Sequence, residues 1–151
     1  MLDASSVDQG AVSHQPEIAP RVAWAEDDRA FRDLVADAIR ADGYDVLALR
    51  NGTELLEYLA ASQIYGLRYP EPSLVILDLM MPGFSGLELA SGLRRARYSR
   101  PVILVTAFGT AETHREARRL GVTAVFDKPF DIDDLRTAVS LLAPISKAPP
   151  I

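Results

Sequence analysis

Short apolar runs alternate with amphipathic stretches along most of this chain. Five runs have the length and composition of β-strands, namely residues 21–25, 44–49, 74–77, 101–106 and 122–126. After each run, apolar residues recur at helical spacing, which predicts helices over residues 29–41, 53–61, 86–97, 110–120 and 131–142. This alternation predicts one α/β domain in which a parallel sheet carries helices on both faces.

Two of the predicted strands are apolar at every position of their central run. Residues 74–77 read Leu-Val-Ile-Leu and residues 102–105 read Val-Ile-Leu-Val, as expected for central parallel strands that are buried on both sides. Glycines at 43 and 121 follow two helices where C-caps are expected, and Ser85 can cap the helix that begins at Gly86. Residues 63–73 contain one glycine and two prolines and are predicted to form a loop.

Both ends of the chain lack this periodicity. Residues 1–20 are rich in small and polar residues, and residues 144–151 contain three prolines, so both segments are predicted to be flexible tails around a domain at 21–143. No apolar run approaches the roughly 18 residues that a membrane helix needs, and the first residues do not resemble a secretion signal. The expected location is therefore the cytoplasm.

Composition excludes several kinds of chemistry. The formal net charge of -5 gives no basic face for nucleic acid. The absence of cysteine excludes disulfides, thiolate catalysis and cysteine-ligated metals. No glycine-rich turn of the kind that binds nucleotides follows a predicted strand.

Polar residues directly follow four of the five predicted strands. In an open parallel sheet, ligands bind beyond the carboxyl ends of the strands, so these residues are expected to converge at one edge. They are Glu26, Asp27 and Asp28 after the first strand, Asp78 after the third, Thr106 after the fourth and Lys128 after the fifth.

This set of side chains suits the binding of a divalent cation and a phosphoryl group. Neighbouring carboxylates repel one another by roughly 1–4 kcal/mol per pair, so such a cluster needs a proton or a cation. Oxygen ligands without cysteine or histidine favour Mg²⁺ or Mn²⁺. Lys128 and Thr106 can hold phosphoryl oxygens while a carboxylate attacks phosphorus.

Four stretches carry a resemblance to a known family. They are VAWAEDD (22–28), LVILDLMMPGFSG (74–86), PVILVTA (101–107) and GVTAVFDKPF (121–130). In this order, and after these strands, they resemble the receiver domain of two-component response regulators, the family of the chemotaxis regulator CheY. The resemblance spans residues 21–142 and implies a flavodoxin-like fold with strand order 2-1-3-4-5.

The resemblance also implies a role for each site residue. Asp78 is the expected phosphoacceptor and a metal ligand, with Asp27 a direct ligand, Glu26 a ligand through water and Met80 a ligand through its backbone carbonyl. Thr106 and the backbone of Ala107 are expected to contact the phosphoryl group, and Lys128 to pair with its oxygens. The bond before Pro129 is expected to be cis.

The implied function is that of a stand-alone receiver. A sensor histidine kinase or phosphotransfer protein docks on the first helix and phosphorylates Asp78, and the face formed by residues 110–120, 122–126 and 131–142 then binds a protein partner or a second copy. The only chemistry expected is Mg²⁺-dependent self-phosphotransfer and self-dephosphorylation, so the chain is not expected to be an enzyme, and neither nucleic acid nor membrane is an expected partner.

Some positions depart from the family pattern. Many receivers carry tyrosine or phenylalanine three residues before the lysine, where this chain has Val125, and Phe126 is expected to point to the other side of the strand. Met80 and Phe108 lie where the family flanks the path of the hydrolytic water, and their apolar side chains predict slow self-dephosphorylation. His114 is expected to be solvated.

Two alternative functions stay open. One is a receiver that acts only through protein contact without phosphorylation, which the intact polar set disfavours. The other is a phosphatase with an aspartyl-phosphate intermediate, which would usually need a second carboxylate at the position of Met80.

Overall fold

Five parallel strands form the centre of the molecule, in the computed structural model that describes residues 17–147. They are β2 (Arg21–Ala25), β3 (Asp45–Leu49), β4 (Leu74–Asp78), β5 (Val102–Thr106) and β6 (Ala124–Asp127). Their order across the sheet is β3-β2-β4-β5-β6, which is 2-1-3-4-5 when only these strands are counted. The predicted flavodoxin-like α/β fold is confirmed.

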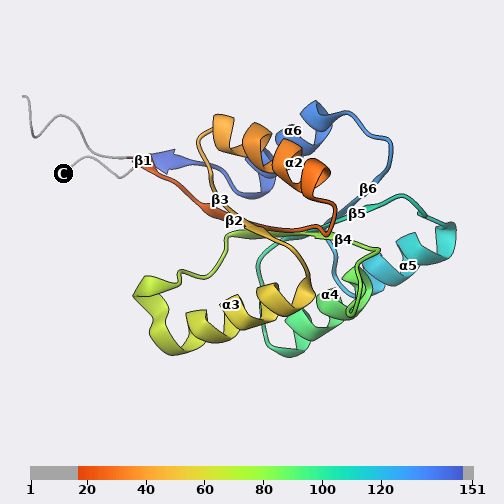
Figure 1. Cartoon of the computed structure of the whole chain (residues 1–151), viewed down its shortest axis with the longest axis horizontal. Helices are drawn as coiled ribbons and strands as arrows, with labels where there is room; N and C mark the ends of the chain where they lie inside the picture. Colours follow the sequence, from red (N-terminus) through yellow and green to blue (C-terminus); the bar gives the residue numbers. More distant parts are fainter. Residues whose placement is uncertain (1–16, 148–151) are drawn as a thin grey trace, which may run out of the picture.

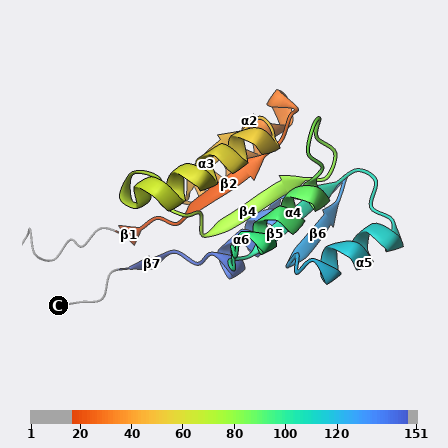
Figure 2. The same ribbon diagram turned by 90° about the horizontal axis from the view of Figure 1, so that it is seen from below.

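Helices cover both faces of this sheet (Figure 1). They are α2 (Arg29–Ala41), α3 (Gly52–Tyr65), α4 (Gly86–Arg95), α5 (Ala111–Arg119) and α6 (Ile132–Leu142). Figure 2 shows α3, α4 and α5 side by side, and their buried residues join one core cluster, whereas those of α2 and α6 join a second cluster on the opposite face.

The central strands and their register align the polar residues at one edge. Every residue of β4 and β5 is buried, as the apolar runs predict. Ala25 lies beside Leu77, Asp78 beside Val105, and Thr106 beside Asp127, so neighbouring strands end at nearly the same level. The residues that follow the strands therefore meet at the carboxyl edge of the sheet.

Two helix starts are fixed close to this edge. The side chain of Asp28 accepts hydrogen bonds from the amides of Ala30 and Phe31 and so caps α2. Ser85 and Glu88 form a reciprocal capping box at the start of α4. A Cβ atom at Gly86 would lie 2.7 Å from the carbonyl oxygen of Asp78, so only glycine lets α4 begin this close to the strand.

The segment predicted as a loop at 63–73 is partly helical. Helix α3 continues to Tyr65 and is followed by the 3₁₀ turn η1 (Gly66–Arg68). The prediction placed the end of the helix four residues too early because nothing before Gly66, which has a φ of +42°, stops a helix. Beyond the turn, the hydroxyls of Tyr58 and Tyr98 donate to the carbonyls of Pro70 and Pro72.

Parts of both predicted tails pair with each other. Strand β1 (Glu17–Ile18) runs antiparallel to β7 (Ser146–Lys147), and Ile145 packs against the core under α2 and α6. These residues form two short strands within the segments predicted to be flexible tails at 1–20 and 144–151. Residues 1–16 and 148–151 of the two predicted tails lie outside the described part of the chain. Within residues 17–147, no helix combines the length and apolar character needed to cross a membrane.

Candidate functional site

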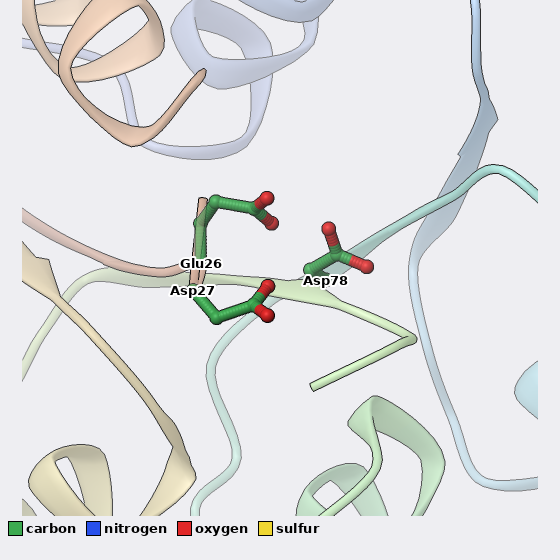
Figure 3. A group of neighbouring side chains, drawn as sticks. All are labelled: Glu26, Asp27 and Asp78. Carbon is green, nitrogen blue, oxygen red and sulfur yellow. The ribbon is translucent and has the colours of Figure 1, made fainter. Parts of the chain in front are cut away.

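Three carboxylates meet at the carboxyl edge of the sheet. Glu26 and Asp27 directly follow β2, and Asp78 ends the adjacent strand β4, so the topology brings them together. One oxygen atom of each lies within 4.8 Å of the others. Figure 3 shows the three side chains directed toward a common space. Glu26 and Asp78 are buried and Asp27 is exposed, so the cluster is reached from solvent on the side of Asp27.

Glu26 is the least satisfied member of this cluster. Its Oε2 atom is buried and has no hydrogen-bond partner within residues 17–147. Burial, and then the neighbouring carboxyl group of Asp78, raise the pKa of Glu26 to about 9, although the Lys128 ammonium opposes the shift. The buried oxygen therefore lacks the partner that a bound proton or cation would supply.

Both oxygens of Asp78 are held in place. Oδ1 accepts a hydrogen bond of 2.9 Å from the amide of Met80, and Oδ2 lies 2.8 Å from Nζ of Lys128. The same ammonium is 3.9 Å from Oε1 of Glu26. Lys128 directly follows β6, and the bond between it and Pro129 is cis, as predicted. The predicted lysine and aspartate are thus in direct contact across the edge of the sheet.

The predicted hydroxyl lies on the next strand. Thr106 is the last residue of β5 and is fully buried, and its Oγ1 accepts a hydrogen bond of 3.0 Å from the amide of Phe108. The side chains of Phe108 and Met80 are apolar and 68% and 58% exposed. The exposed mouth of the site therefore carries apolar side chains on the loops that follow β4 and β5.

The donor set fits a hard divalent cation. Glu26, Asp27 and Asp78 offer three carboxylates around one space, and the orphaned oxygen of Glu26 is a ready ligand atom. Mg²⁺ and Mn²⁺ prefer such oxygen ligands, and Mg²⁺ usually keeps several water molecules, which the exposed side of Asp27 permits. The roles of these residues, and that of the Met80 carbonyl, stay predictions.

Two residues near the site were missed at the level of sequence. Nζ of Lys128 lies over the ring of Phe31, 4.4 Å from its centroid, and the guanidinium of Arg32 donates to the carbonyl of Glu26 at 2.8 Å. The only feature of the sequence that could have indicated these roles was the position of Phe31 and Arg32 in the first turn after the Asp28 cap. His114, expected to be solvated, is 36% exposed and also places Nε2 at 3.0 Å from both carboxylate oxygens of Asp127.

The two residues at the centre of β6 face opposite sides of the sheet, as predicted. Val125 packs with the core cluster under α3, α4 and α5, whereas Phe126 packs with the cluster under α2 and α6. The position where many receivers carry an aromatic ring therefore holds only a small branched side chain, and the adjacent ring cannot reach that face.

A five-stranded parallel sheet in this order, with an acidic pocket and a lysine at its carboxyl edge, defines the CheY-like class of receiver domains. The chain belongs to the response regulator receiver domain family of two-component systems, whose family model matches residues 22–140. Receiver domains are generally signalling modules that bind Mg²⁺ at an acidic pocket and work with histidine kinases or phosphotransfer proteins.

Individual relatives agree with this assignment. The chain is 29% identical over 125 residues to sporulation initiation phosphotransferase F of Bacillus subtilis, covering 83% of this chain and 94% of that protein. It is 33% identical to the transcriptional regulatory protein PdtaR of Mycobacterium tuberculosis over 80% of this chain. The chain spans 55% of PdtaR and 22% of the response regulator FleR of Pseudomonas aeruginosa.

Solved structures show the same architecture. The response regulator TrrA of Thermotoga maritima, in complex with Mg²⁺ and BeF, superposes with a TM-score of 0.69 at 28% identity, over 82% of this chain and 98% of that one. The chemotaxis protein CheY4 of Vibrio cholerae has the same fold, with a TM-score of 0.71 at 23% identity over 83% of this chain and 99% of that one.

Proposed function

We propose that this domain accepts a phosphoryl group on Asp78 and thereby switches a protein-binding face. The donor is the phosphohistidine of a sensor kinase or of a phosphotransfer protein. A carboxylate oxygen of Asp78 forms the new bond to phosphorus as the P–N bond breaks, and the imidazole leaves with the electron pair of that bond. The observation that carries the proposal is the contact of Asp78 with Lys128 inside the three-carboxylate cluster.

The residues of the site have different roles in the proposed transfer. Glu26, Asp27 and Asp78 would hold Mg²⁺ or Mn²⁺, together with the carbonyl of Met80. The cation, when bound, neutralises charge on the transferring phosphoryl oxygens. Lys128 supplies a fixed positive charge beside Asp78, and Thr106 supplies a hydroxyl for the same oxygens. The related TrrA was solved in complex with Mg²⁺ and BeF, which supports the binding of a divalent cation by this domain.

Donor and output surfaces lie on different elements. Helix α2 begins directly beside the acidic pocket and exposes Leu34, which supports it as the docking surface for the donor. Phosphorylation adds negative charge and new acceptor oxygens next to Thr106 and Lys128, which end β5 and follow β6. We therefore place the output on the face formed by α5, β6 and α6, which binds a downstream protein or a second copy.

Intact-protein mass spectrometry after treatment with acetyl phosphate and Mg²⁺ tests the proposal. The wild-type chain is expected to gain one phosphoryl group, and Asp78→Ala and EDTA-treated wild type are expected to gain none. Asp28→Asn is the matched control, because it removes a carboxylate at the same edge while asparagine still caps α2. Phosphate retained in Asp78→Ala, or lost in Asp28→Asn, would contradict the assignment.

A second assay separates a receiver from a phosphatase. A phosphatase with an aspartyl-phosphate intermediate turns over aryl phosphomonoesters continuously. The receiver is expected to show no such turnover, since Met80 stands where those enzymes use a second carboxylate. Sustained hydrolysis that disappears in Asp78→Ala would favour the phosphatase instead.

A further inference from the structure

The ammonium of Lys128 makes a third close contact besides those with Asp78 and Glu26. It lies over the face of the Phe31 ring, 4.4 Å from the centroid, while its distance to Asp78 is 2.8 Å. An aromatic face carries partial negative charge, so it attracts a cation in this position. The Lys128 side chain is only 26% exposed, and partial desolvation strengthens such an attraction.

Other aromatic rings hold the Phe31 ring in its orientation. Trp24 meets it edge to face at 5.8 Å, and Phe130 does so at 6.1 Å from the other end of the chain. Trp24 is fully buried, and its indole N–H donates to the carbonyl of Arg32, which anchors the first turn of α2. The Asp28 cap fixes the same turn by accepting from the amide of Phe31. The ring is thus a rigid platform.

We propose that Phe31 is a positioning residue that holds the Lys128 ammonium against Asp78 and so speeds phosphoryl transfer to this aspartate. The inference rests on the proposed function of Asp78. A lysine side chain has many rotamers, and fixing it costs conformational entropy at the moment of reaction. The ring restricts the ammonium before the donor arrives, so the positive charge is in place when the phosphoryl group transfers.

A simpler role for Phe31 is apolar packing between α2 and the sheet. A leucine fills most of that volume but has no aromatic face, whereas a tyrosine keeps the face. Phe31→Leu and Phe31→Tyr therefore separate packing from the cation contact. Phe126→Leu is the matched control, because Phe126 belongs to the same aromatic cluster and has no described contact with Lys128.

The first measurement needs neither metal nor donor. The sequence contains only two lysines, Lys128 and Lys147, so the ε-methylene protons of Lys128 can be assigned by NMR with Lys128→Arg as reference. The ring current of Phe31 is expected to shift these protons upfield in the wild type, in Phe31→Tyr and in Phe126→Leu. The shift is expected to vanish in Phe31→Leu. No upfield shift in the wild-type protein would overturn the proposal, whatever the variants do.

The second measurement is the rate of phosphorylation by acetyl phosphate at saturating Mg²⁺. Phe31→Leu is expected to slow transfer about threefold to thirtyfold, which is the range that the free energy of a cation–π contact gives at tenfold in rate per 1.36 kcal/mol. The rates of Phe31→Tyr and Phe126→Leu are expected to stay within about twofold of the wild-type rate. Equal rates for the Leu and Tyr variants would overturn the inference. A wild-type protein that takes up no phosphate on Asp78 would instead refute the proposed function, even with the upfield shift present.

Discussion

The stability of the metal-free domain is predicted to fall as pH rises, because of Glu26. Its carboxyl group is buried beside Asp78 and Asp27, and its pKa is raised to about 9 from an ordinary value of 4.5. Between these two values the folded state binds a proton that the unfolded state has released. Folding stability therefore decreases with rising pH in this window, and it is greatest below pH 4.5 as far as this group is concerned.

The size of the stability change depends on one bound proton and on the charged groups around Glu26. A difference of one bound proton changes the free energy of unfolding by about 1.36 kcal/mol per pH unit, so from pH 5.5 to 7.5 the loss approaches 3 kcal/mol. Asp78 and Asp27 disfavour the charged form of Glu26, and Lys128, at 3.9 Å, favours it. Mg²⁺ requires the charged carboxylate, so saturating Mg²⁺ is expected to remove the slope.

Urea denaturation in the presence of a chelator measures this slope. Trp24 is the single tryptophan of the chain and is fully buried, so its fluorescence reports unfolding. The free energy of unfolding is compared between wild type and Glu26→Gln from pH 5.5 to 7.5. The Gln variant has no proton to lose, while the His114–Asp127 pair is common to both proteins and cancels in the difference.

The expected result is a wild-type protein that loses stability relative to Glu26→Gln with each rise in pH. A difference that stays constant over these two pH units would mean that Glu26 is already ionised in the folded state. The same constant difference is expected if the lysine outweighs both burial and the neighbouring carboxylates, since Glu26 would then be ionised in both states throughout this range. That outcome would refute the electrostatic account of the pocket.

Three further predictions concern the mouth of the site, its support and the far end of the domain. Met80 and Phe108 are exposed and apolar beside the pocket, so the phosphorylated protein is expected to have a lifetime far longer than seconds in Mg²⁺ buffer. Met80→Asn is expected to shorten this lifetime, which intact-protein mass spectrometry measures. Gly86→Ala forces a Cβ atom against the Asp78 carbonyl and is expected to cost about 1–3 kcal/mol in urea denaturation. Tyr44→Phe removes the 2.8 Å hydrogen bond to the carbonyl of Ala143 and is expected to cost about 1 kcal/mol by the same measure.

The position of the site could be predicted from the sequence because residues that follow the strands of a parallel sheet all lie at the same edge of that sheet. Once residues 74–77 and 102–105 are identified as central strands, Asp78 and Thr106 must lie at the same edge. The contact of Asp78 with Lys128 follows from the same rule, although 50 residues separate them. The apolar pattern locates the strands, and the sheet topology then brings residues that are far apart in the sequence close together.

Other features depend on contacts that no local pattern encodes. The pairing of Glu17–Ile18 with Ser146–Lys147 joins two-residue segments from opposite ends of the chain, too short to show strand periodicity. The Asp127–His114 contact links a strand end to one face of α5, and either residue alone looks solvated. Phe31 fits the apolar pattern of a helix, which cannot reveal that its ring faces an ammonium.

The charges of the pocket give a physical reason why the proposed phosphoryl acceptance would need a bound cation. Within the described residues, Lys128 is the only cation in a salt bridge with Glu26, Asp27 or Asp78, so one ammonium faces three carboxylates. The raised pKa of Glu26 predicts that the folded metal-free state offsets this imbalance by holding a proton on Glu26. A phosphoryl group brings further negative charge to the same space, which Lys128 alone cannot offset. A divalent cation held by these carboxylates in place of the proton would therefore complete the cluster and supply the charge that the proposed transfer to Asp78 requires.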